Sequence, residues 1–387
     1  MPKRSMINKL MNGECLFSGF GDRGYCSLSS IKGLDIALYG TGQCAHWFHE
    51  IAMKMHGIVP RFAIDRQPLS EYWCGIPTKI PDALKHSVLD VDALHVIVCV
   101  GRLCDFDKIS ESLRNLGVKN IFFWGEFIEA HFPFVSSKDL PCKLNKPLSE
   151  KIHRAFEQLD DELSRKIFCL ILQIVKSGVP SPFPFSSNRY QYFPKDVELT
   201  KGYESYVCCG SYDGENIKKL AELRGEVKKM FCFEPEPKIF EKLSMCARKY
   251  NQSKNTDIRC NEIAVTDSQG VARFQSKSGL GSHISPVGDI EVKTTNLDTY
   301  FSQIDEKPTF ISMDIEGEEL RALRGARGII SLAKPDLAIC VYHKPSHVWE
   351  ALNLLSEFVP EYKYSLRNYT GFAIETVLYA SINEGGF

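Results

Sequence analysis

Short apolar runs alternate with helical segments along most of this chain, and this alternation constrains the fold more than any other feature. After Leu34 the sequence reads DIALYG, then the helical stretch TGQCAHWFHEIAMKMHG and a second apolar run, RFAID. The runs HVIVCVG (95–101) and NIFFWGEF (120–127) follow, separated by the helical stretch FDKISESLRNLG. A strand, a helix and another strand in this order predict a parallel βαβ unit. We therefore expect a small parallel α/β domain over residues 31–133.

The same alternation resumes after Gly202 with seven apolar runs. In chain order they are ESYVCCG, KMFCFEP, IRCNEIAV, FISMDIEG, DLAICVYH, YKYSLRNY and AIETVLYA. Only a turn at 369–372 separates the last two, which is too short for a crossover helix, so we expect them to pair antiparallel at a sheet edge. Residues 201–387 are thus predicted to form a second α/β domain with a seven-stranded sheet.

Residues 134–200 are predicted to connect the two domains. Between 149 and 177 apolar side chains recur at helical spacing, which predicts an amphipathic helix. The helix ends at GVPSPFPFSSNRYQYFP, where the prolines prevent regular structure and indicate a connecting loop.

Composition and charge limit the partners of the chain. The 387 residues include 47 basic and 48 acidic side chains, a net charge of −1 that gives no field to attract nucleic acid. No apolar segment reaches the length of a membrane span or a signal peptide, so we expect a cytoplasmic protein. The 14 cysteines include no CxxC pair, which favours reduced thiols. A small-molecule partner is expected, and the oligomeric state is left open.

A glycine turn follows the first strand of the second domain and predicts a binding site. The strand YVCC runs into Gly210, Ser211, Tyr212, Asp213 and Gly214, and then into a helix whose N-terminus favours an anionic group. Some 20 residues on, the next strand ends at an acidic side chain, Glu234, which could accept the hydroxyl hydrogens of a ribose. The alternative is a tight turn and a solvated strand end without a ligand.

Two later strands end in side chains suited to acid–base chemistry. Asp314 and Glu316 share one face at the carboxyl edge of the sheet, where they could act as a base, orient a hydroxyl group or hold a divalent cation. His343 ends the following strand, and a neutral imidazole there could accept a proton near neutral pH. The alternatives are an acidic first helical turn, which suits Glu318 and Glu319 better, and a histidine that only caps a strand.

The ordered motifs of the second domain resemble those of the FkbM-type methyltransferases, a branch of the Rossmann-like enzymes that use S-adenosylmethionine (SAM). The motifs are GSYDG, FEPEP, NEIAVTD, LDTYF, ISMDIEGEEL with RGA, and PDLAICVYHK, and they cover about 180 residues. The resemblance implies that Gly210, Asp213 and Gly214 line the methionine end of SAM and that Glu234 holds the ribose. It also implies that the segment from Glu262 to Ala264 borders the adenine, with the acceptor over Asp314, Glu316 and His343.

This sequence departs from the family pattern at two positions. Cys208 stands where the family usually has an acidic residue that orients the amino group of the cofactor, and a thiol is only a weak hydrogen-bonding group. Asn368 stands where relatives often carry histidine. The first departure keeps open the alternative that the SAM site is degenerate and no longer binds the cofactor.

The first domain contains a partial match to the sequence motif of dinucleotide-binding folds. Gly40, Gly42 and Ala45 follow a strand as GxGxxA, and Asp65 ends the next strand at about the expected distance. Similar domains precede FkbM-like modules and look like accessory folds of sugar-nucleotide enzymes. We expect a scaffold or a site for a nucleotide or nucleotide-sugar rather than NAD(P) chemistry.

The fold class expected from these observations is α/β, with two Rossmann-like domains joined by a helical linker. The expected activity is a SAM-dependent O-methyltransferase acting on a hydroxyl of a sugar or other small metabolite in surface-glycan biosynthesis. Two alternatives stay open: a non-catalytic nucleotide-binding or sugar-nucleotide-binding protein, and a bifunctional protein whose first domain binds NAD(P). The need for a divalent metal is left open.

Overall fold

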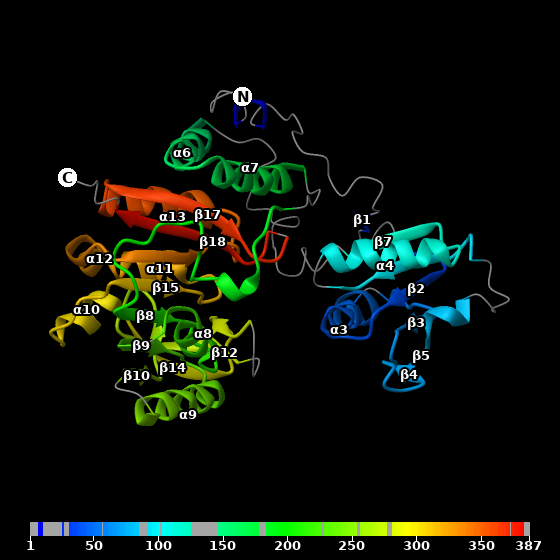
Figure 1. Cartoon of the computed structure of the whole chain (residues 1–387), viewed down its shortest axis with the longest axis horizontal. Coiled ribbons are helices and arrows are strands. Elements are labelled where there is room, and N and C mark those ends of the chain that lie inside the picture. Colours follow the sequence, from blue (N-terminus) through cyan, green and yellow to red (C-terminus); the bar gives the residue numbers. More distant parts are fainter. Residues whose placement is uncertain are drawn as a thin grey trace.

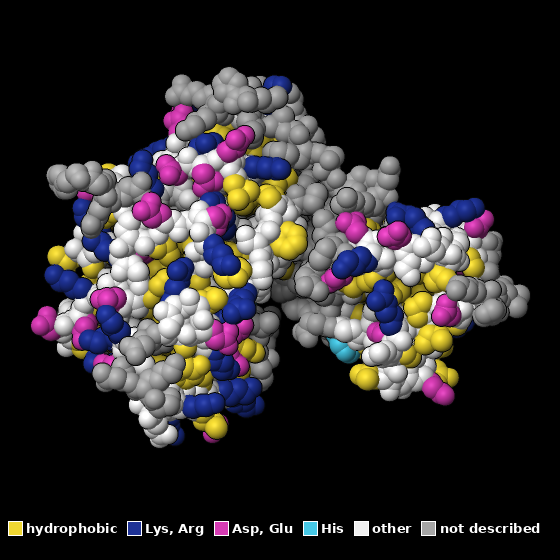
Figure 2. Space-filling view, in the orientation of Figure 1, with side chains coloured by type: hydrophobic (Ala, Val, Ile, Leu, Met, Phe, Trp, Pro, Cys, Tyr) yellow, Lys and Arg dark blue, Asp and Glu magenta, His cyan; other side chains and the backbone are white. Residues whose placement is uncertain are grey.

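The computed structural model forms three β-sheets with helices packed around them (Figure 1). It describes residues 7–10, 25–26, 31–55, 57–84, 91–100, 103–124, 146–177, 183–225, 228–253, 256–276, 281–371 and 373–382. Within these ranges no helix is long and apolar enough to cross a membrane. Basic and acidic side chains are interspersed over the face shown in Figure 2.

The first sheet contains the strands predicted for the N-terminal domain and three short additional ones. Its order is β1 (Tyr25–Cys26), β7 (Asn120–Trp124), β6 (His95–Val98), β2 (Ile36–Tyr39), β3 (Phe62–Ile64), β5 (Ile76–Lys79) and β4 (Tyr72–Trp73). All neighbours are parallel except β4 and β5, as the βαβ pattern predicts.

Helical segments connect strands of this first sheet, including a 3₁₀-helix (Pro81–Leu84) that follows β5. The stretch after β2 forms α3 (Gln43–Phe48) and continues as a π-helix (His49–Met55), and α4 (Leu103–Asn115) joins β6 to β7. The strand β1 precedes the expected start of the domain at residue 31, and the expected end at residue 133 lies outside the described residues.

Two helices replace the single helix predicted between the domains. They are α6 (Lys146–Glu157) and α7 (Glu162–Ser177), and the Asp161 carboxylate accepts the Ser164 N–H at 2.7 Å at the start of α7. The Ser164 hydroxyl in turn accepts the Leu366 N–H at 2.8 Å, on a strand of the C-terminal sheet. We therefore propose that α6 and α7 belong to the C-terminal folding unit.

The second sheet confirms the seven predicted strands. Its order is β10 (Asp257–Asn261), β9 (Lys229–Phe233), β8 (Ser205–Cys209), β15 (Phe310–Met313), β16 (Asp336–Cys340), β18 (Thr376–Ile382) and β17 (Tyr362–Asn368). The first five are parallel, whereas β18 runs antiparallel between β16 and β17, as the short turn predicts. The expected α/β fold is thereby confirmed.

Helices cover both faces of this sheet, which explains why its central strands are mostly apolar. On one face Cys208 and Cys232 pack with α8 (Glu215–Arg224) and α9 (Pro237–Ser253). On the other face Cys209 and Met313 pack in the cluster that also includes side chains of α6, α7 and four further helices. These are α10 (Leu297–Ser302), α11 (Glu319–Arg324), α12 (Arg327–Ala333) and α13 (His347–Phe358).

A third sheet of four strands, which the sequence analysis did not predict, stands beside the second. Its order is β11 (Ala264–Val265), β14 (Ile290–Thr295), β12 (Gly270–Gln275) and β13 (His283–Ile284). The single strand expected over IRCNEIAV is therefore two strands, β10 and β11, which belong to different sheets. Ala264, Phe274 and Val292 form the small core of the third sheet.

Candidate active site

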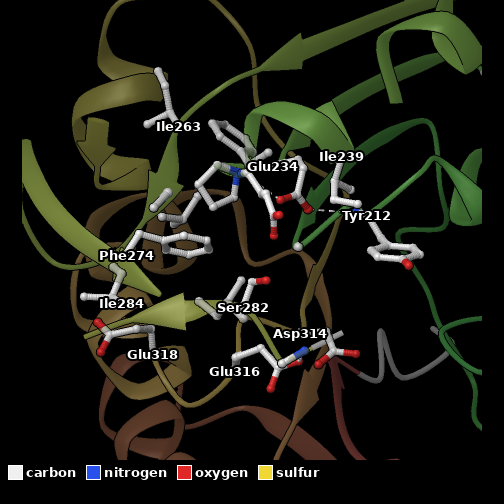
Figure 3. A pocket seen from close by; sticks show the side chains of 18 of the residues that line it. Tyr212, Glu234, Ile239, Ile263, Phe274, Ser282, Ile284, Asp314, Glu316 and Glu318 are labelled. Carbon is white, nitrogen blue, oxygen red and sulfur yellow. Dashed lines mark hydrogen bonds between the residues drawn. The ribbon is translucent and has the colours of Figure 1, made fainter. Parts of the chain in front are cut away.

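A cavity lies where β8, β9 and β15 end and the third sheet approaches them (Figure 3). Its lining residues are Gly210, Tyr212, Phe233, Glu234, Pro235, Glu236, Ile239, Ile263, Ala264, Val265, Phe274, Gly281, Ser282, Ile284, Asp314, Ile315, Glu316, Glu318, Tyr342 and Glu375. In Figure 3, Ile263, Phe274 and Ile284 lie on one side, whereas Asp314 and Glu316 lie at the other end. The cavity thus has two parts. We call the part at Ile263, Phe274 and Ile284 the apolar slot, and the part at Asp314 and Glu316 the acidic edge.

Gly210 shapes the turn that leads into the cavity. Its φ of 80° lies in the left-handed region, and a Cβ there would stand 1.8 Å from the Asp314 carbonyl oxygen. The Gly210 and Ser211 N–H groups both donate to the Phe233 carbonyl at 3.0 Å, so the turn is tied to the end of β9. A residue with a side chain would separate β8 from the segment after β15.

Glu234 is held in place by the backbone around it. Its carboxylate accepts the Tyr212 N–H at 3.1 Å and the Glu236 N–H at 3.0 Å. Burial raises the pKa of Glu234 to about 7, with a smaller contribution from the charge of Glu236, and the two backbone hydrogen bonds oppose this. Tyr212 has a φ of 48°, an uncommon value outside glycine that the contact with Glu234 helps to maintain.

Four of the eight predicted cofactor residues line the cavity, namely Gly210, Tyr212, Glu234 and Ala264. The other four do not. The Ser211 hydroxyl donates to the Cys208 carbonyl at 2.8 Å, and the Asp213 carboxylate accepts the Glu215 N–H at 3.2 Å. Gly214, with a φ of 90°, starts α8, and the Glu262 side chain is exposed.

Cys208, the position at which the sequence departs from the family pattern, points away from the cavity. Its side chain is 1% exposed and packs with Tyr206 and Cys232 under α8 and α9. The Asn216 side-chain amide donates to its Sγ at 3.4 Å. Asn368, the second departure, is buried and donates to the Ile374 carbonyl, so it supports the turn before β18.

The predicted catalytic residues come together at the acidic edge. Asp314 accepts the Tyr342 hydroxyl at 3.1 Å and the Tyr192 hydroxyl at 2.7 Å. Glu316 has a φ of 54° and accepts the Gly281 N–H at 3.0 Å. Burial raises the pKa of Glu316, the proximity of His343 lowers it, and the charge of Asp314 raises it further, for a net increase.

His343 lies behind these two carboxylates. Its Nε2 atom is 3.5 Å from Asp314 Oδ1 and 3.4 Å from Glu316 Oε2, and its Nδ1 atom is 2.8 Å from Glu319 Oε1. Burial by itself would lower the pKa of His343, but the three carboxylates outweigh it and raise the pKa to about 10. The sequence analysis expects a neutral imidazole, whereas these carboxylates keep it protonated at neutral pH.

Glu319 has a larger role than that of an acid in a first helical turn, which the sequence suggests. It is 1% exposed and its Oε1 atom accepts the Ile315 and Gly317 N–H groups at 3.0 and 3.3 Å. Its Oε2 atom lies 3.2 Å from Nδ1 of His347. Burial would raise the pKa of Glu319, but His343 lowers it well below its usual range.

Sequence reasoning also missed several residues that line or support the cavity. Glu375, in the turn before β18, accepts a hydrogen bond from the Gln191 amide, and burial together with Asp314 raises its pKa to about 7. Glu236 is 2% exposed. The second acid of FEPEP was a signal for Glu236, whereas no periodicity points to Glu375 or Tyr192.

The residues predicted for a second site in the N-terminal domain form a closed turn. Gly40 has a φ of 100°, and Asp65 Oδ2 accepts both the N–H and the hydroxyl of Thr41, at 3.0 and 2.6 Å. Asp65 Oδ1 accepts the Gln67 N–H at 3.0 Å. Gly42 precedes α3, which has six residues. The carboxylate that would hold a ribose is thus engaged by its own turn, and a nucleotide site here stays a prediction.

Comparisons with known proteins identify a matching family and a similar fold. Residues 209–366 match the family described as "Methyltransferase FkbM domain". The fold is similar to that of Methyltransferase FkbM from Methylobacillus flagellatus KT, at 19% identity and a TM-score of 0.70, over 98% of this chain and 99% of that one.

Two further solved structures match more distantly. An O-methyltransferase from Bacillus cereus in complex with SAH matches at 11% identity and a TM-score of 0.33, over 58% of this chain and 92% of that one. Fibrillarin from Aeropyrum pernix with bound S-adenosyl-L-methionine matches at 11% identity and a TM-score of 0.30, over 48% and 69%. No curated protein matches the sequence.

Proposed function

Because residues 209–366 match the family described as "Methyltransferase FkbM domain", we propose that the chain is a SAM-dependent methyltransferase that methylates a hydroxyl group of a sugar or another small metabolite. One observation carries the proposal: a single cavity connects the apolar slot beside Glu234 with the acidic edge at Asp314 and Glu316. A nucleoside cofactor and a hydroxyl acceptor can therefore meet in it.

The residues of the slot fit SAM. Glu236 Oε2 is buried without a hydrogen-bond partner, and the Glu234 carboxylate lies two residues before it, so the pair offers acceptors for ribose hydroxyl groups. Ile263, Phe274 and Ile284 supply an apolar surface for an adenine ring. In this arrangement the cofactor would be held by Gly210, Tyr212, Glu234, Glu236 and Ala264. It would supply a methyl group that is bonded to a positively charged sulfonium sulfur.

The protein then has to position the acceptor oxygen and remove one proton. Asp314 is the best-placed acceptor of that proton, because it lines the cavity, whereas His343 stands behind it. The hydroxyl groups of Tyr192 and Tyr342 fix the orientation of the Asp314 carboxylate. Glu316 and Glu375 line the same cavity and can accept hydrogen bonds from other hydroxyl groups of a sugar.

The proposal also covers the class of the acceptor and the cellular compartment of the reaction. Several carboxylates at one edge suit a polyhydroxylated acceptor, since each can accept hydrogen bonds from hydroxyl groups. The family resemblance supports a role in surface-glycan biosynthesis in the cytoplasm. Incubation of the protein with radiolabelled SAM and a panel of free sugars and nucleotide-sugars tests the acceptor class directly.

Isothermal titration with S-adenosylhomocysteine (SAH) tests the cofactor site. We expect binding at one site per chain, and a Glu234→Ala variant should bind more weakly by about tenfold or more, because a charge-assisted hydrogen bond contributes about 1.5–3 kcal/mol. A natively folded protein that shows no heat of binding with SAH would refute the proposal.

Turnover measurements test the acidic edge. Asp314→Asn should lower kcat by about 100-fold or more, since positioned proton transfer contributes that much, while the affinity for SAH changes little. His343→Ala should also lower kcat, because it removes the imidazolium that lies 3.5 Å from the Asp314 carboxylate. Glu361→Gln, which removes an exposed partner of Lys334, serves as the control and should retain full turnover. Unchanged turnover in both Asp314→Asn and His343→Ala would remove this edge from the mechanism.

A further inference from the structure

We infer that Asp314, Glu319 and His343 form a binding site for one divalent cation of the Mn²⁺ or Zn²⁺ type. Binding of the ion can be tested without methyl transfer, but its role at the acceptor rests on the proposed function. The inference depends on the spacing of the ligand atoms, on buried polar atoms that lack partners, and on the charge of the cluster.

The spacing of the three side chains suits a metal ion. One ligand atom from each lies within 4.8 Å of the other two, and among the described residues this is the one such group of histidine, cysteine and acidic side chains. With bonds of about 2.1 Å, neighbouring ligand atoms stand roughly 3 Å apart and opposite ones about 4.2 Å apart. Small rotations of the side chains would therefore bring all three atoms to bonding distance of a common ion.

Buried polar atoms in the cluster lack hydrogen-bond partners. Both ring nitrogens of His343 and the Oε2 atom of Glu319 are buried and make no hydrogen bond of acceptable angle, although carboxylate oxygens lie 2.8–3.5 Å from the ring. The His343 side chain is 9% exposed and that of Glu319 is 1% exposed. A buried polar atom without a partner is costly, and an ion would supply the missing interaction.

The charge of the cluster also favours a cation. The carboxylates of Asp314, Glu316 and Glu319 surround one imidazole, so the negative charge exceeds the positive even when His343 is protonated. His347 adjoins Glu319 on its far side, and the Lys344 ammonium is bonded to the Gly317 carbonyl at 2.9 Å. A divalent ion that binds His343 would displace its proton into solution, and the charge of the ion would then balance the carboxylates where they meet.

The ligand atoms indicate which metals suit the site. Carboxylate oxygens favour Mg²⁺, Ca²⁺ and Mn²⁺, whereas an imidazole nitrogen favours Zn²⁺ and other transition metals. Mn²⁺ and Zn²⁺ accept both kinds of ligand. Because Asp314 and Glu316 also line the cavity, an ion here would face the acceptor and could hold its hydroxyl oxygen in place.

Titration with Mn²⁺, followed by electron paramagnetic resonance on the full chain stripped of metal, tests this site without SAM. We expect one Mn²⁺ per chain, displaced by Zn²⁺. Asp314→Asn and His343→Ala should each weaken binding by roughly a hundredfold, because each removes a ligand. Glu318→Gln changes an acid that lines the same cavity but bonds to Thr266 and Arg321, so it should keep the Mn²⁺ affinity of the wild type.

Circular dichroism of each variant confirms that it is folded, and the conservative Asp314→Asn change keeps the side-chain shape. Absence of Mn²⁺ and Zn²⁺ binding up to 1 mM, about the weakest affinity of a metal module, would overturn the inference. The inference would also fail if Asp314→Asn and His343→Ala both bound Mn²⁺ as tightly as the wild type. SAH binding by a chain that binds no metal overturns the inference alone. Metal binding by a chain that does not bind SAH overturns the proposed cofactor site alone.

Discussion

At the scale of single residues, Glu234 should make the binding of the cofactor depend on pH. Its raised pKa of about 7 means that the side chain is half protonated near neutral pH, and only the ionised form presents two acceptor oxygens. A ribose that binds the ionised form should therefore bind more weakly as the pH falls through 7. The direction follows from burial, which favours the neutral carboxyl group.

We expect the dissociation constant for SAH to rise by up to about tenfold between pH 8 and pH 6, which is the limit for one titrating group with a pKa near 7. Isothermal titration across this range measures the change. Glu234→Gln cannot titrate and should show a flat profile with weaker binding throughout. A wild-type profile as flat as that of Glu234→Gln would contradict the assignment of the pH dependence to Glu234.

The environment of Cys208 gives a second prediction, which contrasts with the expectation from the family pattern. The pattern suggests that an acidic residue here would improve SAM binding. In this structure the side chain is 1% exposed in an apolar cluster and does not line the cavity. A carboxylate in its place would be buried with the Asn216 amide as its nearest partner.

Cys208→Asp should therefore lower the melting temperature without strengthening SAH binding, since an incompletely paired buried carboxylate costs about 3 kcal/mol. Cys208→Ser, a neutral change of similar size, is the control and should cost less. Thermal unfolding and SAH titration of both variants decide the matter. A Cys208→Asp protein that binds SAH more tightly than the wild type would show that the native site is degenerate.

At the scale of secondary structure, the sequence predicted the elements that are buried on both faces. Runs such as YVCC and LAIC are apolar throughout because helices cover both sides of the sheet, and such runs are easy to recognise. The third sheet escaped prediction because β11 and β13 have only two residues each and β12 is mostly exposed, with one buried position in Gly270–Gln275. The predicted helix over 149–177 is interrupted where Asp161 caps the start of α7, a local hydrogen bond that outweighs the continuous apolar spacing.

The same contrast holds for the site. Gly210, Glu234 and Asp314 follow strands directly, and His343 comes three residues after the end of β16, so their positions could be derived from the order of the strands. Three other residues of the site do not follow strands: Glu319 lies at the start of a helix, Tyr192 in a loop and Glu375 in a turn. Their contacts depend on tertiary packing. The protonated state of His343 could not be predicted either, because it depends on three carboxylates that meet only in the folded chain.

At the scale of the whole molecule, the contacts of α6 and α7 bear on where the C-terminal folding unit begins. Ser164 joins α7 to β17 through the Leu366 N–H, and its hydroxyl also accepts a hydrogen bond from the buried Arg367 guanidinium at 3.0 Å. The Gln158 amide bonds to Asn353 of α13 at 3.2 Å. Removal of both helices would expose the apolar surface that they cover and leave these polar groups without partners.

A fragment that starts at residue 146 should therefore fold and bind SAH as the full chain does, whereas a fragment that starts at residue 183 should be insoluble or bind no SAH. Circular dichroism and SAH titration of the two fragments measure this. Ser164→Ala in the longer fragment is a graded probe, since it leaves the Leu366 N–H unpaired at a cost of about 1–3 kcal/mol. If the shorter fragment were as stable as the longer one, α6 and α7 would be a linker and the unit would begin near residue 201, because the contacts of Ser164 would then contribute nothing to the stability of the sheet.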